Sequence, residues 1–322
     1  MSDSTFSSAP AALAAGLLAL VVATTSAIAG TPAGTVSTAS AAPEQVDSAT
    51  DAVLADGALA YVFETLDYPG ASSTILWGID DFGGLTGQYA VAGGPAHAMT
   101  RLHGNFEPLD PARLGTYFSA AGGPNDVGTV FGAYADATGA QHGYVIRNGR
   151  FETVDFGAHL NSNVDGVNLF DEILGVYWDA DGVFHGVLRR HGKDTRIDVP
   201  GARDTYPLGL NTGGESVGYW DTDPKVTHGY HRSAAGKIAL LDVPGQQSTV
   251  AFSINDRGQV GGYYTDPAGS LHGFVKAGRQ IRVIDVPGAV ATVVTSINNW
   301  GSVAGEYFDA TGARHGFVAT PR

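Results

Sequence analysis

Histidine is the residue whose spacing most suggests chemistry, because six of the ten histidines recur at intervals of 43 to 45 residues. Histidine can ligate a metal or act as an acid or base near neutral pH. Equivalent residues of a repeat lie on a ring, however, and only side chains near its axis can converge on one ion. We therefore expect these histidines to be structural, each bound to an aspartate across a neighbouring turn. The histidines are His97, His142, His185, His228, His272 and His315, and the turn aspartates are Asp136, Asp179, Asp266 and Asp309.

A second column of polar residues lies seventeen positions before each of these histidines. It consists of Asp80, Asn125, Asn168, Asn211, Asn255 and Asn298. Asparagine three residues before a glycine is typical of a tight turn, since its side chain bonds nearby backbone and glycine adopts positive φ. We expect turn chemistry at this column. The alternative is a polar ring near an axis that binds water or a cation.

No motif of a hydrolase nucleophile elbow, a zinc protease, a phosphate-binding loop or an EF-hand occurs in the sequence. The segment 179–182 comes closest to a calcium loop, but it lacks the downstream glutamate and falls on an expected turn. The sequence therefore requires no metal and no cofactor.

The elements that must position these columns belong to a repeat of about 43 residues, which occurs six times from Tyr61 onward. In the last copy, four short strand candidates cover 281–286, 292–297, 302–308 and 315–320. Four antiparallel strands per unit without helical periodicity predict an all-β fold, a six-bladed β-propeller. Its units are expected at about 61–105, 106–150, 151–194, 195–237, 238–280 and 281–322.

The order of the strands also predicts how the ring closes. The chain enters the repeats with a fourth-type strand at 62–67 and leaves them on a third-type strand that ends near Thr320. We expect the N-terminal strand to pair with the last blade. This pairing would remove an open sheet edge that otherwise favours aggregation.

The N-terminal region predicts export. An apolar run at 11–23 is followed by Ala27-Ile28-Ala29, which is typical of a signal peptide covering residues 1–29. Residues 30–60 have the composition of a flexible linker, within which 51–60 could form a short helix or an extra strand. The chain contains no cysteine, so a secreted, extracellular domain would be stable without disulfides.

The composition of the chain limits the classes of molecule that it can bind. The chain is 43% hydrophobic, enough for a large core, and its net charge is −14, with 18 basic and 32 acidic residues. This charge repels nucleic acid, and it repels anionic membrane surfaces once a signal peptide is removed. We expect a monomer whose ligand is a small molecule, a glycan or a protein.

The units DVPGA, SINNWGSVAGEYFD and HGF resemble the extracellular repeats called the HAF family. The resemblance covers residues 61–320 and implies secretion and a propeller, with no assigned activity. Units one to three depart from the pattern, since Ala98 follows His97 in place of glycine, Val91 replaces an aspartate and Asp171 replaces a turn glycine. These blades are therefore candidates for specialisation.

We expect a site where the repeat is broken, at the connections that enter the first strands of units two to four. These entry connections cover 110–117, 156–165 and 201–206. Arginine there could recognise an anion and tyrosine could stack on a sugar, although both are also common as surface charge and as packing. The candidate ligand-binding residues are Arg113, Tyr117, His159, Asp165, Arg203, Asp204 and Tyr206.

Two functions follow from this placement. The first is a binding or scaffold protein that recognises its ligand at the channel face, and the absence of catalytic motifs favours it. The alternative is an enzyme of lyase, hydrolase or cyclase type, with His159, Asp165 and Arg203 as catalytic candidates at the channel mouth. A concave pocket that holds these side chains would favour an enzyme, and a flat rim of tyrosine and arginine would favour binding.

Overall fold

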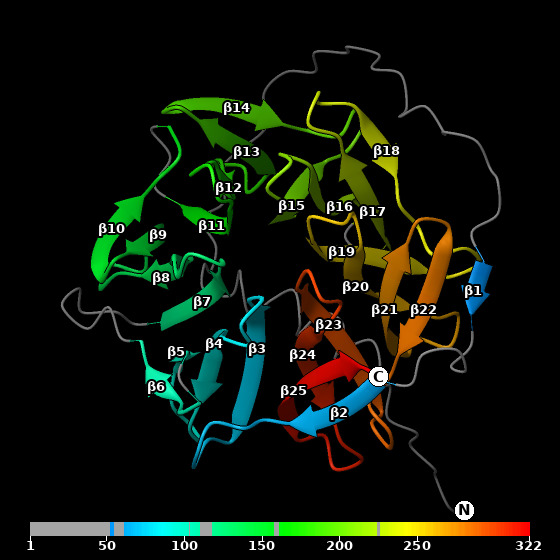
Figure 1. Cartoon of the computed structure of the whole chain (residues 1–322). Coiled ribbons are helices and arrows are strands. Elements are labelled where there is room, and N and C mark those ends of the chain that lie inside the picture. Colours follow the sequence, from blue (N-terminus) through cyan, green and yellow to red (C-terminus); the bar gives the residue numbers. More distant parts are fainter. Residues whose placement is uncertain (1–51, 55–60, 103, 110–117, 158–160, 224–225) are drawn as a thin grey trace, which may run out of the picture.

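The computed structural model describes residues 52–54, 61–102, 104–109, 118–157, 161–223 and 226–322. Six antiparallel blades of four strands surround a central axis, as Figure 1 shows. Within each blade the first strand in sequence is the innermost, except that the fourth strand of the last blade comes from the N-terminus. The predicted six-bladed propeller is confirmed.

The strands of the first three blades are β3 (Ser73–Ile79), β4 (Leu85–Ala90), β5 (Ala96–Arg101), β6 (Glu107–Pro108), β7 (Phe118–Pro124), β8 (Val130–Ala135), β9 (Gln141–Arg147), β10 (Arg150–Val154), β11 (Ser162–Val167), β12 (Ile173–Trp178), β13 (Phe184–Arg190) and β14 (Lys193–Ile197). Those of the last three are β15 (Asp204–Leu210), β16 (Ser216–Asp223), β17 (Val226–Arg232), β18 (Ile238–Leu240), β19 (Ser248–Ile254), β20 (Val260–Thr265), β21 (Leu271–Ala277), β22 (Gln280–Ile284), β23 (Ala291–Ile297), β24 (Val303–Phe308), β25 (Arg314–Pro321) and β2 (Tyr61–Thr65).

The ring closes as the strand order predicts. Strand β2 pairs antiparallel with β25 from Tyr61↔Pro321 to Thr65↔Phe317. The Tyr61 hydroxyl donates to the Gly301 carbonyl at 3.1 Å, and the Phe63 and Phe317 rings lie 6.1 Å apart. The two ends of the repeat region therefore share one blade, and the C-terminal strand has no open edge on this side.

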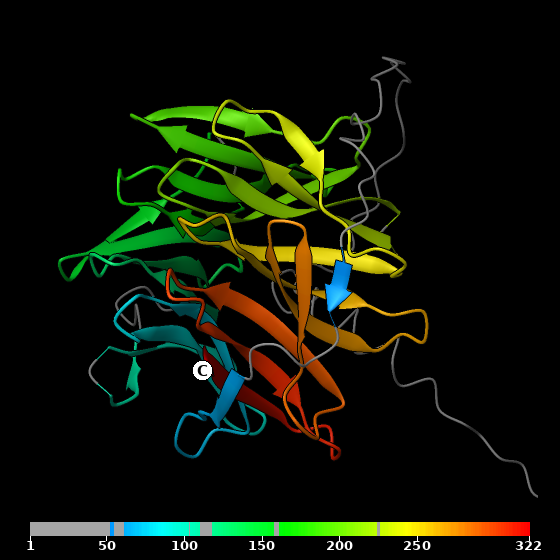
Figure 2. The same ribbon diagram turned by 45° about the vertical axis from the view of Figure 1, so that its right-hand side comes forward.

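One short strand lies outside the blades. Strand β1 (Ala52–Leu54) pairs in parallel with β22, and Figure 2 shows it along the outer edge of the fifth blade. Of the two possibilities for 51–60, the structure shows an extra strand at 52–54, and the rest of that segment lies outside the described residues. The predicted signal peptide also lies outside them. In the described ranges, no helix has the length and apolar character needed to cross a membrane.

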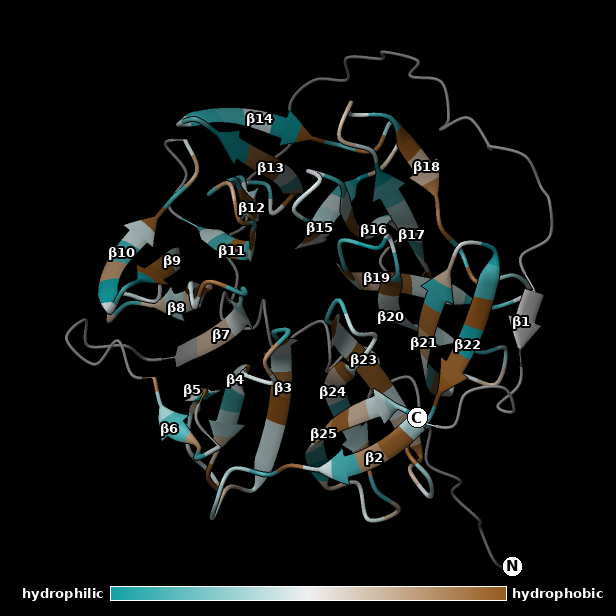
Figure 3. Cartoon of the chain, in the orientation of Figure 1, coloured by the Kyte–Doolittle hydropathy of each residue, from teal (hydrophilic) through white to brown (hydrophobic). Residues whose placement is uncertain are grey.

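Side chains fill the spaces between blades, and the outermost strands face solvent. Strand β14 is largely hydrophilic in Figure 3, and four of its five residues are exposed. Charged outer edges of this kind oppose edge-to-edge association of sheets.

Close packing inside a blade depends on glycine: a Cβ on Gly262 would lie 2.1 Å from the Val250 carbonyl oxygen and 2.9 Å from the Phe274 ring. A glycine recurs in this place in every unit, and at all six a Cβ would lie 1.9–2.1 Å from a carbonyl oxygen of the adjacent strand. The six are Gly87, Gly132, Gly175, Gly218, Gly262 and Gly305.

The histidine column is structural, although its main partner differs from the expected one. His272 Nδ1 lies 2.7 Å from Asp285, at the end of the fourth strand, and His315 Nδ1 lies 2.7 Å from Asp67. The expected turn aspartates are more distant, with Asp266 at 3.5 Å from His272 Nε2. The hydrogen bond to Asp67 raises the pKa of His315. Five of the histidines, His142, His185, His228, His272 and His315, are thus shown to join the end of the fourth strand to the third. All of these except His228 also contact the turn aspartate, because two imidazole nitrogens can contact two carboxylates.

The asparagine column forms the predicted turns and also links successive blades. Asn255 Oδ1 accepts hydrogen bonds from the backbone N–H groups of Arg257 and Gln259 at 3.1 and 2.9 Å. Its Nδ2 donates to the carbonyl of Asn298 in the next blade at 2.8 Å, and Asn298 donates in turn to Asp80 at 3.0 Å. We call the turn between the first two strands of a blade its inner turn. Five asparagines of the column, together with Asp126, which accepts the Asp81 N–H, link the six inner turns in a ring around the axis.

Removing the Asn255 side chain is expected to destabilise the protein by about 2–4 kcal/mol, because Asn255→Ala leaves one buried carbonyl and two half-buried turn N–H groups without partners. Asn255→Asp keeps the acceptor oxygen, as Asp80 does in the first blade, and should cost less. Urea denaturation measures both. Equal stability of the alanine variant and the parent would remove the role of this ring.

Candidate ligand site on the propeller axis

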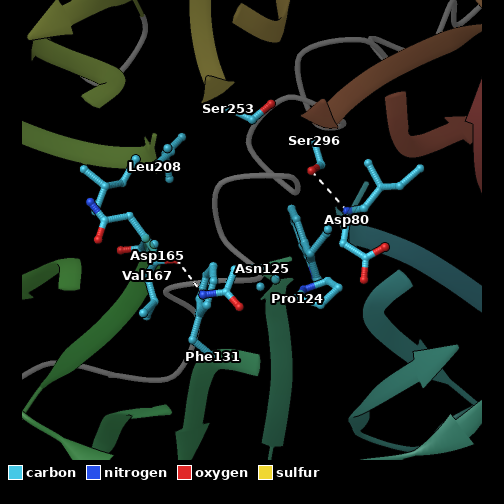
Figure 4. A pocket seen from close by; sticks show the side chains of 18 of the residues that line it. Asp80, Pro124, Asn125, Phe131, Asp165, Val167, Leu208, Ser253 and Ser296 are labelled. Atoms are coloured by element: carbon cyan, nitrogen blue, oxygen red, sulfur yellow. Dashed lines mark hydrogen bonds between the residues drawn. The ribbon is translucent and has the colours of Figure 1, made fainter. Parts of the chain in front are cut away.

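A cavity of about 250 Å³ lies on the propeller axis and is lined by residues of all six innermost strands. This volume is slightly below the range typical of pockets for drug-sized ligands, about 300–1,000 Å³. One end of the cavity is formed by the inner turns, and Figure 4 shows side chains from several blades pointing into it. The cavity can therefore admit a small organic molecule.

A β-bulge at the same position of every innermost strand aims one residue at the cavity. In β11, for example, Val164 pairs with Gly175 and Gly166 with Leu174, so that Asp165 is left without a partner in the ladder. Bulges redirect a side chain and are frequent next to functional sites. The six bulge residues are Trp77, Gly122, Asp165, Leu208, Phe252 and Thr295, and all of them line the cavity. The repeat thus fixes their position and leaves their chemistry free to differ.

An aromatic pair forms one part of this ring. The rings of Trp77 and Phe252 lie 6.0 Å apart at an interplanar angle of 36°. The Trp77 indole N–H donates to Gln88 at 3.2 Å, which satisfies its only polar group. Between these two blades, the Thr295 hydroxyl donates to the Leu76 carbonyl at 2.6 Å. The pair therefore presents an apolar, π-rich surface to a ligand.

Asp165 supplies a polar group on another part of the ring. Figure 4 shows it beside Leu208, across the cavity from Ser296. The residue as a whole is half-buried, but its Oδ2 atom has no accessible surface and no hydrogen-bond partner among the described residues. Burial raises the pKa of Asp165 to about 8. Its carboxyl group is thus mostly protonated at neutral pH, and a ligand can hydrogen-bond Oδ2 only after the side chain turns toward the cavity.

Aspartates at the inner turns form the end of the cavity. Asp126 Oδ1 accepts from the Asp81 N–H at 2.9 Å, and Asp81 Oδ1 accepts from the Asn299 N–H at 2.7 Å. Burial raises the pKa of Asp126, and the nearby charges of Asp81, Asp80 and Asp256 raise it further. These carboxylates therefore hold neighbouring turns together and give this end of the cavity a negative potential.

Large apolar side chains surround the same end of the propeller. Phe82, Val127, Phe170 and Trp300 each stand two positions after the asparagine column, and their exposed fractions are 83%, 69%, 71% and 64%. We call these four residues the apolar crown. The equivalent positions of the other two blades hold Gly213 and Arg257, and the Arg257 guanidinium lies 5.6 Å from the Trp300 ring centre. Exposed apolar residues that cluster on one face are typical of a binding surface.

The predicted site residues are only partly brought together. Asp165 lines the cavity, whereas Arg203 forms an ion pair with Asp204 at the entry connection, the opposite end of the innermost strand. Asp204 is buried and accepts the Phe184 N–H at 2.9 Å. Tyr206 stacks between Phe184 and Tyr219, with ring centres 4.6 and 4.5 Å away, and does not line the cavity. Arg113, Tyr117 and His159 lie outside the described residues.

No protein-family model matches the chain, and no curated protein matches it in sequence. Its fold is similar to that of a fungal lectin from Aleuria aurantia, a six-bladed β-propeller, at 10% identity and a TM-score of 0.45 over 66% of this chain and 77% of the lectin. A gluconolactonase from Xanthomonas campestris has 11% identity and a TM-score of 0.45, over 81% and 90% of the two chains. An acylaminoacyl peptidase from Pyrococcus horikoshii has 8% identity and a TM-score of 0.47, over 80% of this chain and 53% of the peptidase. These likenesses concern the fold and not the activity.

Trp77 and Phe252 are the residues of the cavity that the sequence did not single out. Both lie in first strands that follow the repeat closely, so the strands themselves show no break in the pattern. The available signal is the comparison of one column across units, because the position three residues before the asparagine column holds six different residue types. A variable column inside an otherwise regular strand indicates a position that faces a site.

Proposed function

We propose that this protein binds a small molecule in its axial cavity. The observation that carries the proposal is the ring of six bulge residues, which places an aromatic pair and an unpartnered carboxyl group on the walls of one cavity. We also propose that the protein is exported, on the strength of the signal-peptide pattern in residues 1–29.

The energetics of Asp165 support a ligand. A buried carboxyl group without a hydrogen-bond partner costs the folded state about 1–3 kcal/mol or more. The equivalent residue of the next blade is Leu208, so the fold accepts an apolar side chain at this position. Local features that destabilise a fold without a structural gain are typical of functional sites. A ligand that hydrogen-bonds Asp165 would recover this free energy on binding.

Catalysis is the second candidate function, and the raised pKa of Asp165 is the observation that favours it, because it suits a general acid or base near neutral pH. Among the described residues, however, no other acid or base forms a hydrogen bond with Asp165. We therefore favour binding. Incubation with each ligand followed by mass spectrometry separates the two functions, since a binding protein returns its ligand unchanged.

A thermal-shift screen of the full chain against metabolites, amines and glycans tests the proposal. A ligand at a concentration 100-fold above its Kd adds about 2.7 kcal/mol of stability and should raise Tm by several degrees. The shift should disappear in Trp77→Ala, which removes the cavity wall. It should persist in Trp220→Ala, a matched change at an outer tryptophan that stacks on His228. A shift that survives Trp77→Ala, or no shift with any compound, would contradict the proposal.

A further inference from the structure

We infer that the ligand of the axial cavity is an organic cation, a protonated amine or a quaternary ammonium ion, held between the Trp77–Phe252 pair and Asp165. This inference rests on the proposed function and names the ligand class for the same cavity.

Charge is the first argument. The residues that line the cavity include five aspartates, and no lysine, arginine or histidine is among them. The aspartates are Asp80, Asp81, Asp126, Asp256 and Asp165. Without a ligand Asp165 is mostly neutral at pH 7, and a cation beside it would favour its ionised form. A narrow cavity with walls of one sign concentrates ligands of the opposite sign. This lining disfavours phosphates and carboxylates and favours a cation.

The aromatic pair is the second argument, and it is independent of the first. A cation within about 6 Å of a tryptophan ring gains roughly 0.5–2 kcal/mol, and tryptophan is the strongest of the aromatic partners. The Trp77 N–H is already bonded to Gln88, so a hydrogen bond from the ligand is not needed there. Two rings 6.0 Å apart can contact the methyl or methylene groups that surround an ammonium nitrogen.

The lining favours an organic cation over a bare metal ion. In the part of the chain that the structure describes, no group of three or more histidine, aspartate or glutamate residues is arranged to hold a metal. The inner-turn carboxylates already accept backbone N–H groups, as Asp256 does from Thr212 at 2.7 Å. A cavity of about 250 Å³ is also far larger than a metal ion needs. Among the described residues, none forms a hydrogen bond with the Asp165 Oδ2 atom. Asp165 is therefore the carboxyl group that we assign to the ligand.

The test compares organic cations with neutral molecules of the same shape. Choline is paired with 3,3-dimethylbutan-1-ol, and benzyltrimethylammonium with neopentylbenzene, because each pair differs only by a charged nitrogen in place of a carbon. Calorimetric titrations use the full chain, its Asp165→Asn variant and, as a matched control, Asp171→Asn. The control makes the same substitution at Asp171, an exposed inner-turn residue that pairs with Arg147. Its φ is 62°, a value that asparagine tolerates.

We expect at least one cation to bind tenfold or more tightly than its neutral partner. This preference should be lost in Asp165→Asn and kept in Asp171→Asn. Equal affinities within both pairs, or failure of both cations to bind, would overturn the inference. The proposed function is judged separately: a neutral probe such as α-methyl-L-fucoside that binds the parent but not Trp77→Ala would sustain an axial ligand site while excluding a cation-selective one.

Discussion

Replacing Asp165 by asparagine is expected to stabilise the ligand-free protein, and increasingly so as the pH rises from 5 to 8. Burial raises the pKa of this carboxyl group from 3.8 to about 8 in the folded state. Between these two values the folded protein holds a proton that the unfolded chain has released. The stability of the parent therefore falls with rising pH, by up to about 1.4 kcal/mol per pH unit for this group, and asparagine removes that loss.

Urea denaturation of both proteins at pH 5, 6, 7, 8 and 9 measures this effect. The difference between the two stabilities should grow to several kcal/mol by pH 8 and then level off, because above the folded pKa both states are ionised. The exposed substitution Asp171→Asn is the control and should follow the parent. If the Asp165→Asn curve also ran parallel to the parent, the carboxyl group would be solvated, and its role as an unsatisfied buried group would have to be abandoned.

Deleting residues 61–67 should lower the stability by about 3–5 kcal/mol and Tm by about 10 °C, and should cause aggregation. The deletion removes the β2–β25 pairing, the contact of Phe63 with Phe317 and the bond of His315 to Asp67. The edge of β25 is then open to other molecules. Size-exclusion chromatography and calorimetry detect the two effects.

A deletion of equal length at 31–37, in the predicted linker, is the control and should leave Tm unchanged. If the pairing of β2 with β25 stabilises the ring, only the 61–67 deletion should lower Tm. A monomeric 61–67 deletion with the Tm of the parent would show that the ring is held together by the contacts between blades alone.

Much of the fold could be predicted from the sequence, because each blade repeats the same local rules. A fixed histidine position recurs six times, and asparagine before a turn glycine recurs in four units, with Asp80 and Asp171 as the exceptions in the other two. The register of one unit therefore supports that of the others. The closure by β2 followed from strand order alone. The partner of the histidines did not, because one aspartate lies in the hairpin turn and another at the end of the fourth strand, and the sequence does not show which imidazole nitrogen faces each.

The site was harder to predict for a physical reason. We looked for it at the entry connections, where the repeat is broken, whereas the cavity is lined by innermost strands that keep the repeat. A bulge shifts the alternation of a strand by one residue, so that Trp77 and Phe252 face the axis although simple alternation does not mark them. Asp165 was singled out for its position near a connection, and it faces the axis because of the bulge.

Filling the cavity is the most direct test of an axial ligand site. Gly122→Leu places at a glycine bulge the residue that the fourth blade carries there, Leu208, and its Cβ would lie 3.2 Å from the Phe131 ring, which must shift slightly. Titration calorimetry with the compound that gives the largest thermal shift should show a more than tenfold loss of affinity in a variant that still unfolds cooperatively. An affinity equal to that of the parent would show that the ligand binds elsewhere.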